Sequence, residues 1–93
     1  MNSLINLALI GASGVVGKKI ISLLENKNVE INNFYPLGST SVGDEIVFNN
    51  NEYKIKDLTD FDYSKVNLAI FSAGSKVAEE HAKDFVNAGV YVI

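Results

Sequence analysis

Apolar and polar residues along the chain are arranged in blocks that predict short strands alternating with helices. Residues 5–10 are mostly apolar and end at Gly11, which is typical of a buried strand because glycine interrupts the run too early for a helix. From Val15 the apolar spacing becomes helical, and the asparagine-rich segment 25–28 is expected to end that helix. Its predicted buried face consists of Val16, Ile20, Leu23 and Leu24.

A second strand is expected over residues 33–38, where aromatic and apolar residues precede a cluster of serine and threonine. Pro36 has no backbone N–H to donate, so this strand should lie near an edge of the sheet or turn its proline nitrogen away from a neighbour. Residues 45–48 and 52–56 are rich in β-forming side chains and flank three asparagines. This pattern predicts a hairpin.

Residues 57–66 contain several aspartates and a serine and are expected to form a turn-rich connection back to the sheet. A third buried strand is expected over residues 66–71, followed by a helix over 76–87 that stops before Gly89. Residues 90–93 begin a further strand. The predicted buried stripe of the second helix is Ala78, Ala82, Phe85 and Val86.

The alternation of strands and helices predicts an α/β fold: a Rossmann-like, doubly wound, mostly parallel sheet with right-handed crossovers and a hairpin insertion. We interpret residues 1–93 as one domain, because a chain of this length can bury one modest core. No helix follows the last strand to cover it. We therefore expect the domain to be incomplete and the chain to be part of a longer protein.

Composition argues against several classes of function. The net charge of −3 and the lack of arginine disfavour a nucleic-acid surface, which needs clustered cations. Without cysteine there is no thiolate nucleophile or cysteine metal site, and the single histidine, His81, is expected at the boundary of a helix rather than in catalysis. Residues 4–10 are too short for a membrane span and lack a basic leader, so a cytoplasmic protein is the default expectation.

The segment GASGVVG, residues 11–17, places three glycines at a spacing of three between the first strand and the first helix. The first amides of a helix are unpaired and lie at the positive end of its dipole, so they can bind a diphosphate if small residues let it approach. Gly11 would permit the tight turn, Gly14 the close approach and Gly17 the helix–sheet contact. The predicted donors are Ser13 and the N–H groups of Val15 and Val16. The alternative is a glycine-rich turn that binds nothing.

The end of the second strand bears on which nucleotide is bound. An Asp or Glu there would pair with a ribose 2′-hydroxyl, whereas this chain has the uncharged Ser39, Thr40 and Ser41. Three hydroxyls and no acid favour NADP, although no guanidinium is present to neutralise a 2′-phosphate, and NAD stays possible. The alternative is a solvent-exposed serine turn.

The loop after the third strand should lie at the same sheet edge as Gly11. Its small residues Ser72, Ala73 and Gly74 are therefore predicted to pass beside the ribose or nicotinamide half of the cofactor. A plain β-α turn is the alternative.

These residues resemble the N-terminal cofactor-binding part of the aspartate-β-semialdehyde dehydrogenases. ALIGASGVVG resembles the first strand and phosphate loop of that family, residues 57–75 resemble the segment leading into its second cofactor loop, and VYVI matches the strand that follows. The resemblance covers nearly the whole chain. Thr40 stands where family members often carry an arginine, and Ser75 replaces a second glycine.

The resemblance implies that the parent enzyme reduces L-aspartyl-4-phosphate with NADPH, on the route to lysine, threonine and methionine. It also implies a cysteine nucleophile, a histidine acid/base and substrate-binding arginines, all beyond Ile93, in a homodimer or homotetramer. No catalytic or metal-binding residue is therefore expected in this chain. Three alternatives are an N-acetyl-γ-glutamyl-phosphate reductase, a short-chain dehydrogenase or epimerase, and a non-catalytic homologue that keeps the nucleotide fold.

Overall fold

The computed structural model of this chain describes residues 4–72 and 76–93. Its elements follow one another as strand, helix and hairpin units, and their bounds agree closely with the sequence expectations. They are β1 (Asn6–Ile10), α1 (Val15–Asn26), β2 (Asn33–Gly38), β3 (Glu45–Phe48), β4 (Asn51–Lys54), β5 (Lys56–Asp57), the 3-10 turns η1 (Leu58–Asp60) and η2 (Tyr63–Lys65), β6 (Leu68–Phe71), α2 (Lys76–Asn87) and β7 (Tyr91–Val92).

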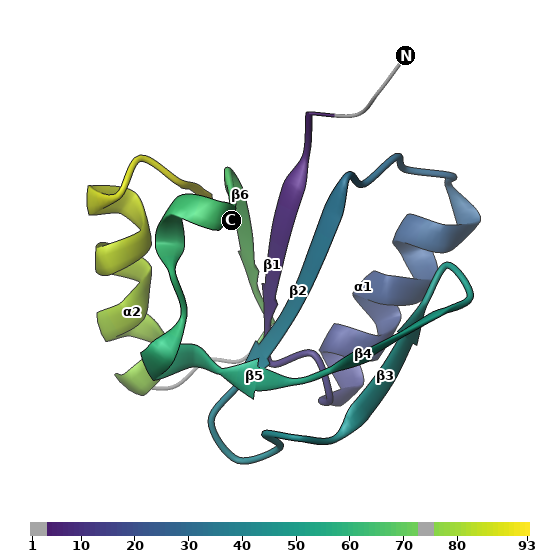
Figure 1. Cartoon of the computed structure of the whole chain (residues 1–93), viewed down its shortest axis with the longest axis horizontal. Coiled ribbons are helices and arrows are strands. Elements are labelled where there is room, and N and C mark those ends of the chain that lie inside the picture. Colours follow the sequence, from purple (N-terminus) through teal and green to yellow (C-terminus); the bar gives the residue numbers. More distant parts are fainter. Residues whose placement is uncertain (1–3, 73–75) are drawn as a thin grey trace.

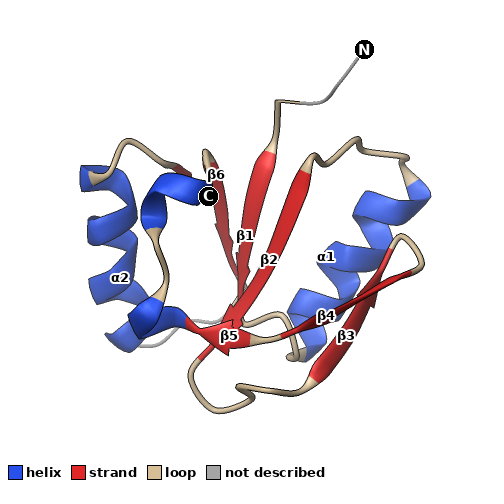
Figure 2. Cartoon of the chain, viewed as in Figure 1, coloured by secondary structure: helices blue, strands red, loops and turns tan. Residues whose placement is uncertain are grey.

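The centre of the molecule is a five-stranded sheet in the order β5-β2-β1-β6-β7, and each adjacent pair is parallel. Figure 1 shows α1 and the β3–β4 hairpin on one side of this sheet and α2 on the other. The chain moves outward from β1 to β2 and then returns to the other side of β1 to form β6 (Figure 2). The predicted Rossmann-like, doubly wound architecture with a hairpin insertion is confirmed.

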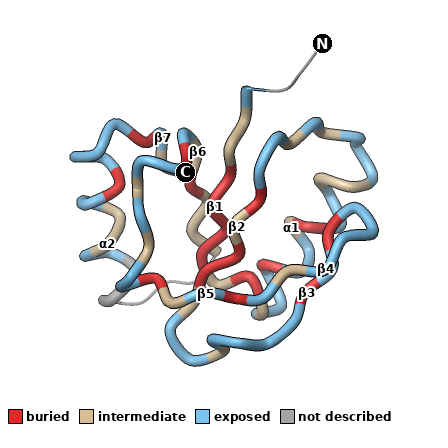
Figure 3. The backbone as a smooth tube through the Cα atoms, in the orientation of Figure 1, coloured by how far each residue is buried: buried red, intermediate tan, exposed pale blue. Residues whose placement is uncertain are grey.

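Strand β1 supplies side chains to both layers of the core, because neighbouring residues of a strand point to opposite faces. Leu7 and Leu9 pack with α1 and the hairpin, while Ala8 and Ile10 pack on the side of α2. All four are buried, and buried residues concentrate in the middle of the sheet (Figure 3). The carboxyl end of β1 is thus held firmly where residues 11–14, the glycine loop between β1 and α1, begin.

The buried face of α1 agrees only in part with the predicted one, because Ile20 and Leu24 pack against the core as expected but the other two predicted residues do not. Gly17 and Ile21 are the buried residues of the helix, whereas Val16 and Leu23 are 53% and 55% exposed. The apolar spacing favoured Val16 and Leu23, but the close approach of the helix to the glycine loop turns Gly17 inward instead. In α2, Phe85 is buried as predicted, whereas Val86 is 59% exposed and the Ala78 side chain lies outside the described residues.

Leu23 and Leu24 form a matched pair that tests this face. Leu24 packs partly against the core, so Leu24→Ala should lower the free energy of unfolding by about 1–2 kcal/mol. Leu23→Ala should change it by less than about 0.5 kcal/mol, because Leu23 is mostly exposed. Urea denaturation of both variants measures the difference. Equal losses for the two leucines would contradict the observed orientation of α1.

Strand β2 lies one position from the edge of the sheet, in agreement with the constraint set by Pro36. The outer strand β5 pairs with it only at Leu37 and Gly38, beyond the proline. The hairpin turn is a two-residue turn at Asn49 and Asn50, both with positive φ, a conformation that asparagine tolerates better than most residues. The expected three-asparagine turn is therefore one residue shorter in the structure.

Two Asp-capped turns form the connection between β5 and β6. The Asp57 carboxylate accepts hydrogen bonds from the amide and hydroxyl of Thr59, and Asp62 does the same with Ser64. The side-chain hydrogen bonds, supported by the backbone ones, lower the pKa of both aspartates. The turn-rich connection expected from the sequence is confirmed.

Because the pKa of both aspartates is lowered in the fold, we expect the free energy of unfolding to fall in acid. A carboxylate whose folded pKa is lowered stabilises the fold above its unfolded pKa of about 4, and the contribution disappears as pH falls toward the folded pKa. In the double variant Asp57→Asn and Asp62→Asn, the amide oxygens should still accept the hydrogen bonds of the turns. The variant has no carboxyl group at these two positions to be protonated. Urea denaturation at pH 5, 4 and 3 should show a shallower fall in stability for this variant. Superimposable curves for wild type and variant would contradict the prediction.

Aromatic side chains fill the layer between the sheet and α2. Phe85 is fully buried, with ring centroids 4.6 Å from Tyr63 and 5.7 Å from Phe71. Burial, with a smaller effect of Asp84, raises the pKa of Tyr63. The Tyr63 hydroxyl lies 3.2 Å from His81 Nδ1 and joins η2 to α2. His81 is half-buried, as expected for a boundary histidine.

Candidate functional site

The loop from β1 to α1 turns sharply at Gly11, whose φ is +82°. Only glycine adopts this region at no steric cost. The Gly11 amide donates to the Leu37 carbonyl at 2.9 Å, and the Gly14 amide donates back to the Gly11 carbonyl at 3.1 Å. The loop is therefore attached to the end of β2 as it enters the helix.

The first turn of α1 is not capped by a side chain. Gly14 is the N-cap residue and is exposed, and the first helical bond runs from the Lys18 amide to the Gly14 carbonyl. The amides of Val15, Val16 and Gly17 precede that bond, so they have no acceptor inside the helix. An anion placed beside Gly14 would meet these amides and the positive end of the helix dipole.

Gly17 sits where the helix touches the glycine loop. A Cβ atom at this position would lie 2.8 Å from the Ala12 carbonyl oxygen and still closer to the Gly11 carbonyl oxygen. A Cβ atom at Gly14 would instead lie 3.4 Å from the Gly11 carbonyl oxygen, which is an ordinary van der Waals contact. Gly17 thus serves the packing of the helix against the loop, whereas Gly14 keeps the surface in front of the helix open.

The loop after β2 lies against the glycine loop. Ser13 Oγ donates to Ser41 Oγ at 2.8 Å, which joins residues 28 positions apart. Ser39 and Thr40 are exposed. The three hydroxyl residues predicted near the adenosine end are therefore at the same sheet edge as the glycine loop, and Ser41 contacts it directly.

The end of β6 approaches the glycine loop from the other side. Ser72 Oγ donates to the carbonyl oxygens of Ile10 at 2.7 Å and Gly11 at 3.0 Å, and the Ser72 amide also donates to Ile10. Ala73 and Gly74 lie outside the described residues. The parallel topology predicts that the ends of β2 and β6 lie beside the glycine loop. Nothing in the local sequence indicates that the hydroxyls of Ser41 and Ser72 form hydrogen bonds with that loop.

The assembled edge is uncharged and rich in backbone donors. Segments 11–17 and 38–43 contain no charged side chain, and exposed Lys18 and Lys19 follow the first segment. A phosphate group would meet no carboxylate from these two segments. Such an edge can bind a phosphorylated ligand through amides and hydroxyls without a metal.

The His, Asp and Glu residues of the part of the chain that the structure describes form no group of three or more that could hold a metal ion. No helix within residues 4–72 and 76–93 combines the length and apolar character needed to cross a bilayer.

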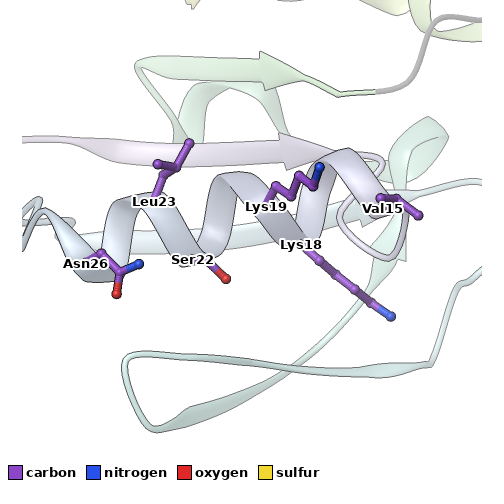
Figure 4. Close-up of a pocket in the computed structure, with 6 residues that line it drawn as sticks. All are labelled: Val15, Lys18, Lys19, Ser22, Leu23 and Asn26. Atoms are coloured by element: carbon purple, nitrogen blue, oxygen red, sulfur yellow. The ribbon is translucent and has the colours of Figure 1, made fainter.

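A shallow hollow on α1 lies beside this edge but is a different feature. Its lining residues all come from the outer surface of the one helix (Figure 4). They are Val15, Lys18, Lys19, Ser22, Leu23 and Asn26. Because no other element contributes a wall, the hollow cannot surround a ligand. Leu23 lines it because this side chain lies on the exposed side of α1.

The comparison with protein families agrees with this geometry. Residues 6–93 match the family described as "Semialdehyde dehydrogenase, NAD binding domain". The chain belongs to this family. Similar curated proteins include the aspartate-semialdehyde dehydrogenases of Legionella pneumophila, 44% identical over 94 residues, and of Campylobacter jejuni, 38% identical over 90 residues. These matches cover 100% and 94% of this semialdehyde dehydrogenase domain but only 27% and 26% of the relatives.

Solved structures carry the same domain. Aspartate semialdehyde dehydrogenase II from Vibrio cholerae, in a complex with ASA, superimposes with a TM-score of 0.91 at 31% identity, over 97% of this chain and 30% of that one. A USG-1 protein homolog of Pseudomonas aeruginosa is also 33% identical over 94 residues, which is 100% of this chain and 28% of that protein. The semialdehyde dehydrogenase domain thus spans somewhat more than a quarter of these relatives.

Proposed function

We propose that this chain binds a nicotinamide dinucleotide, with the diphosphate resting on the amino end of α1. The observation that carries the proposal is the uncapped first turn of that helix behind the exposed Gly14. The amides of Val15, Val16 and Gly17 have no acceptor within the helix, Gly14 adds no side chain in front of them, and a diphosphate supplies the acceptors that they lack. The membership of residues 6–93 in an NAD-binding family supports the same ligand.

The rest of the dinucleotide follows from the parallel sheet. Its adenosine ribose would lie at the loop after β2, where hydroxyls replace the acid that usually selects NAD, so we propose NADP as the preferred cofactor. The nicotinamide half would extend past the end of β6. The residues proposed to form the cofactor site, by direct contact or by holding its loops, are Gly11, Ser13, Gly14, Val15, Val16, Gly17, Ser39, Thr40, Ser41, Ser72, Ala73 and Gly74.

For the whole enzyme we propose the reduction of L-aspartyl-4-phosphate to L-aspartate 4-semialdehyde and phosphate. The cofactor, when bound, supplies the hydride that replaces the phosphate leaving group. This chain contributes binding and orientation, since its 93 residues include neither a cysteine nor an arginine to act as nucleophile or substrate clamp. Relatives named aspartate-semialdehyde dehydrogenase support this reaction over that of an N-acetyl-γ-glutamyl-phosphate reductase. A homodimeric or homotetrameric parent is part of the same proposal.

Titration of the chain with NADPH and NADH, followed by nicotinamide fluorescence, tests the binding site. We expect saturable binding of both, tighter for NADPH because hydroxyls can donate to the 2′-phosphate. Ser22→Ala, on the outer surface of α1, is the matched control and should bind like the wild type. Failure of both cofactors to saturate the chain would contradict the proposal, and tighter NADH would contradict the cofactor preference.

A second candidate is a nucleotide-binding protein without dehydrogenase activity. The similarity of this chain to a USG-1 protein homolog, whose name states no reaction, supports this second candidate. The two candidates differ in the remainder of the parent protein, where only the dehydrogenase requires a cysteine nucleophile. Assay of the parent with aspartyl phosphate and NADPH separates them, because the second candidate binds cofactor without turnover.

A further inference from the structure

The Ser72 hydroxyl donates its hydrogen bonds to the backbone at the start of the glycine loop. One short bond to the Ile10 carbonyl and a longer one to the Gly11 carbonyl share its single proton. Both carbonyls belong to the turn that directs the chain into α1. The Ser72 hydroxyl therefore has no proton left to donate to a ribose or nicotinamide group while these bonds are made.

The opposite flank of the loop is held in a similar way. Ser41 accepts a hydrogen bond from Ser13, the residue just before the N-cap of α1. Ser41 is itself fixed in a turn, since the Asp44 amide donates to its carbonyl at 3.0 Å. Two serines from the ends of different strands thus contact the start and the end of the same glycine loop.

We propose that Ser41 and Ser72 are positioning residues that act on the cofactor through the glycine loop. Together they hold the loop between residues 11 and 14 in the shape that leaves the first amides of α1 open. This inference rests on the proposed binding of a dinucleotide and deepens it. It assigns these two hydroxyls to the loop, although the sequence alone placed them directly against the cofactor.

For Ser72, comparison of two ligands separates a direct contact with the cofactor from an action through the glycine loop. ADP carries the diphosphate but lacks the nicotinamide half, so a direct contact of Ser72 with that half would be invisible to ADP. If Ser72 acts through the loop, Ser72→Ala should weaken NADPH and ADP by the same factor, about two- to tenfold. Ser41 is proposed beside the adenosine ribose, which ADP shares with NADPH, so for Ser41→Ala the hydrogen exchange of the glycine loop separates the two roles. Ser22→Ala should leave both affinities unchanged.

Both alanine variants are expected to fold. The Ile10 carbonyl keeps its bond from the Ser72 amide, and the Gly11 carbonyl keeps its bond from the Gly14 amide. Ser13 and Ser41 are both half-buried, so water can replace the lost hydroxyl. Hydroxyl rescue provides a further control, because Ser72→Thr and Ser41→Thr should recover affinity that alanine loses.

Amide hydrogen exchange in the free chain gives a readout that does not depend on ligand. Loss of either hydroxyl should speed exchange in residues 11–16 and leave α2 unchanged. A drop in NADPH affinity with unaltered ADP affinity, or unchanged exchange at residues 11–16, overturns the proposal. Absence of any ligand binding by the wild type overturns the proposed function instead, so the two failures are distinguishable.

Discussion

Replacement of Gly14 by aspartate is expected to abolish dinucleotide binding while the chain stays folded. The backbone at Gly14 has φ −73° and ψ 170°, which any residue adopts, and an added Cβ meets nothing closer than 3.4 Å. Aspartate is also among the preferred N-cap residues, so the free energy of unfolding should stay equal or rise by a few tenths of a kcal/mol. The new carboxylate would occupy the surface proposed for the diphosphate.

The expected loss of NADPH affinity is about 100-fold or more, because placing the negative carboxylate beside the negative diphosphate costs several kcal/mol. Gly14→Asn is the matched variant, with nearly the same size and capping ability but no charge. It should lose less affinity than Gly14→Asp, and the gap between them should narrow as salt screens the repulsion. Fluorescence titration at two salt concentrations gives these values. Wild-type affinity in Gly14→Asp would move the ligand away from the amino end of α1.

Gly17→Ala is expected to destabilise the chain and displace the glycine loop, although alanine favours helix more than glycine does. In an isolated helix this change would stabilise by about 1 kcal/mol. Here the methyl group collides with two backbone carbonyl oxygens, of Gly11 and Ala12, which cannot rotate away like a side chain. We expect a net loss of about 3 kcal/mol in the free energy of unfolding, within the upper range for overpacking.

Thermal and urea denaturation of Gly17→Ala measure that loss, and Gly14→Ala in the same loop is the control. The control should unfold like the wild type, since its methyl group makes only an ordinary contact. The Gly17 variant should also lose NADPH affinity, because the amides of the first turn move with the helix. A variant at position 17 as stable as the control would show that the helix can withdraw from the loop at little cost.

Much of the fold could be predicted from local patterns. The bounds of β2 and α2 agree residue for residue with the expected ranges, because the apolar pattern begins each element and a glycine lies at or just after its C-terminal end. The glycine spacing also located the strand–turn–helix. The short strand β5 escaped prediction, since its two residues form a strand only through pairing with Leu37 and Gly38.

The buried face of α1 shows why pattern and packing diverge. Glycine adds nothing to an apolar pattern, so the spacing of valine and leucine favoured a face that includes Val16 and Leu23. The structure buries the face of Gly17 and Ile21, because a residue without a side chain is required where the helix crosses the loop. A contact made possible by a missing side chain leaves no mark in the hydrophobic periodicity.

By itself, the sequence determined the order of the elements, the parallel α/β architecture and the position of the glycine-rich turn between β1 and α1. Local spacing and glycine placement suffice for these, since each depends on residues close together in the chain. Only the tertiary structure decided which face of α1 is buried and that Ser41 and Ser72 bond to the glycine loop. Those hydrogen bonds join residues 28 to 62 positions apart, and only the pairing of parallel strands brings them to one edge.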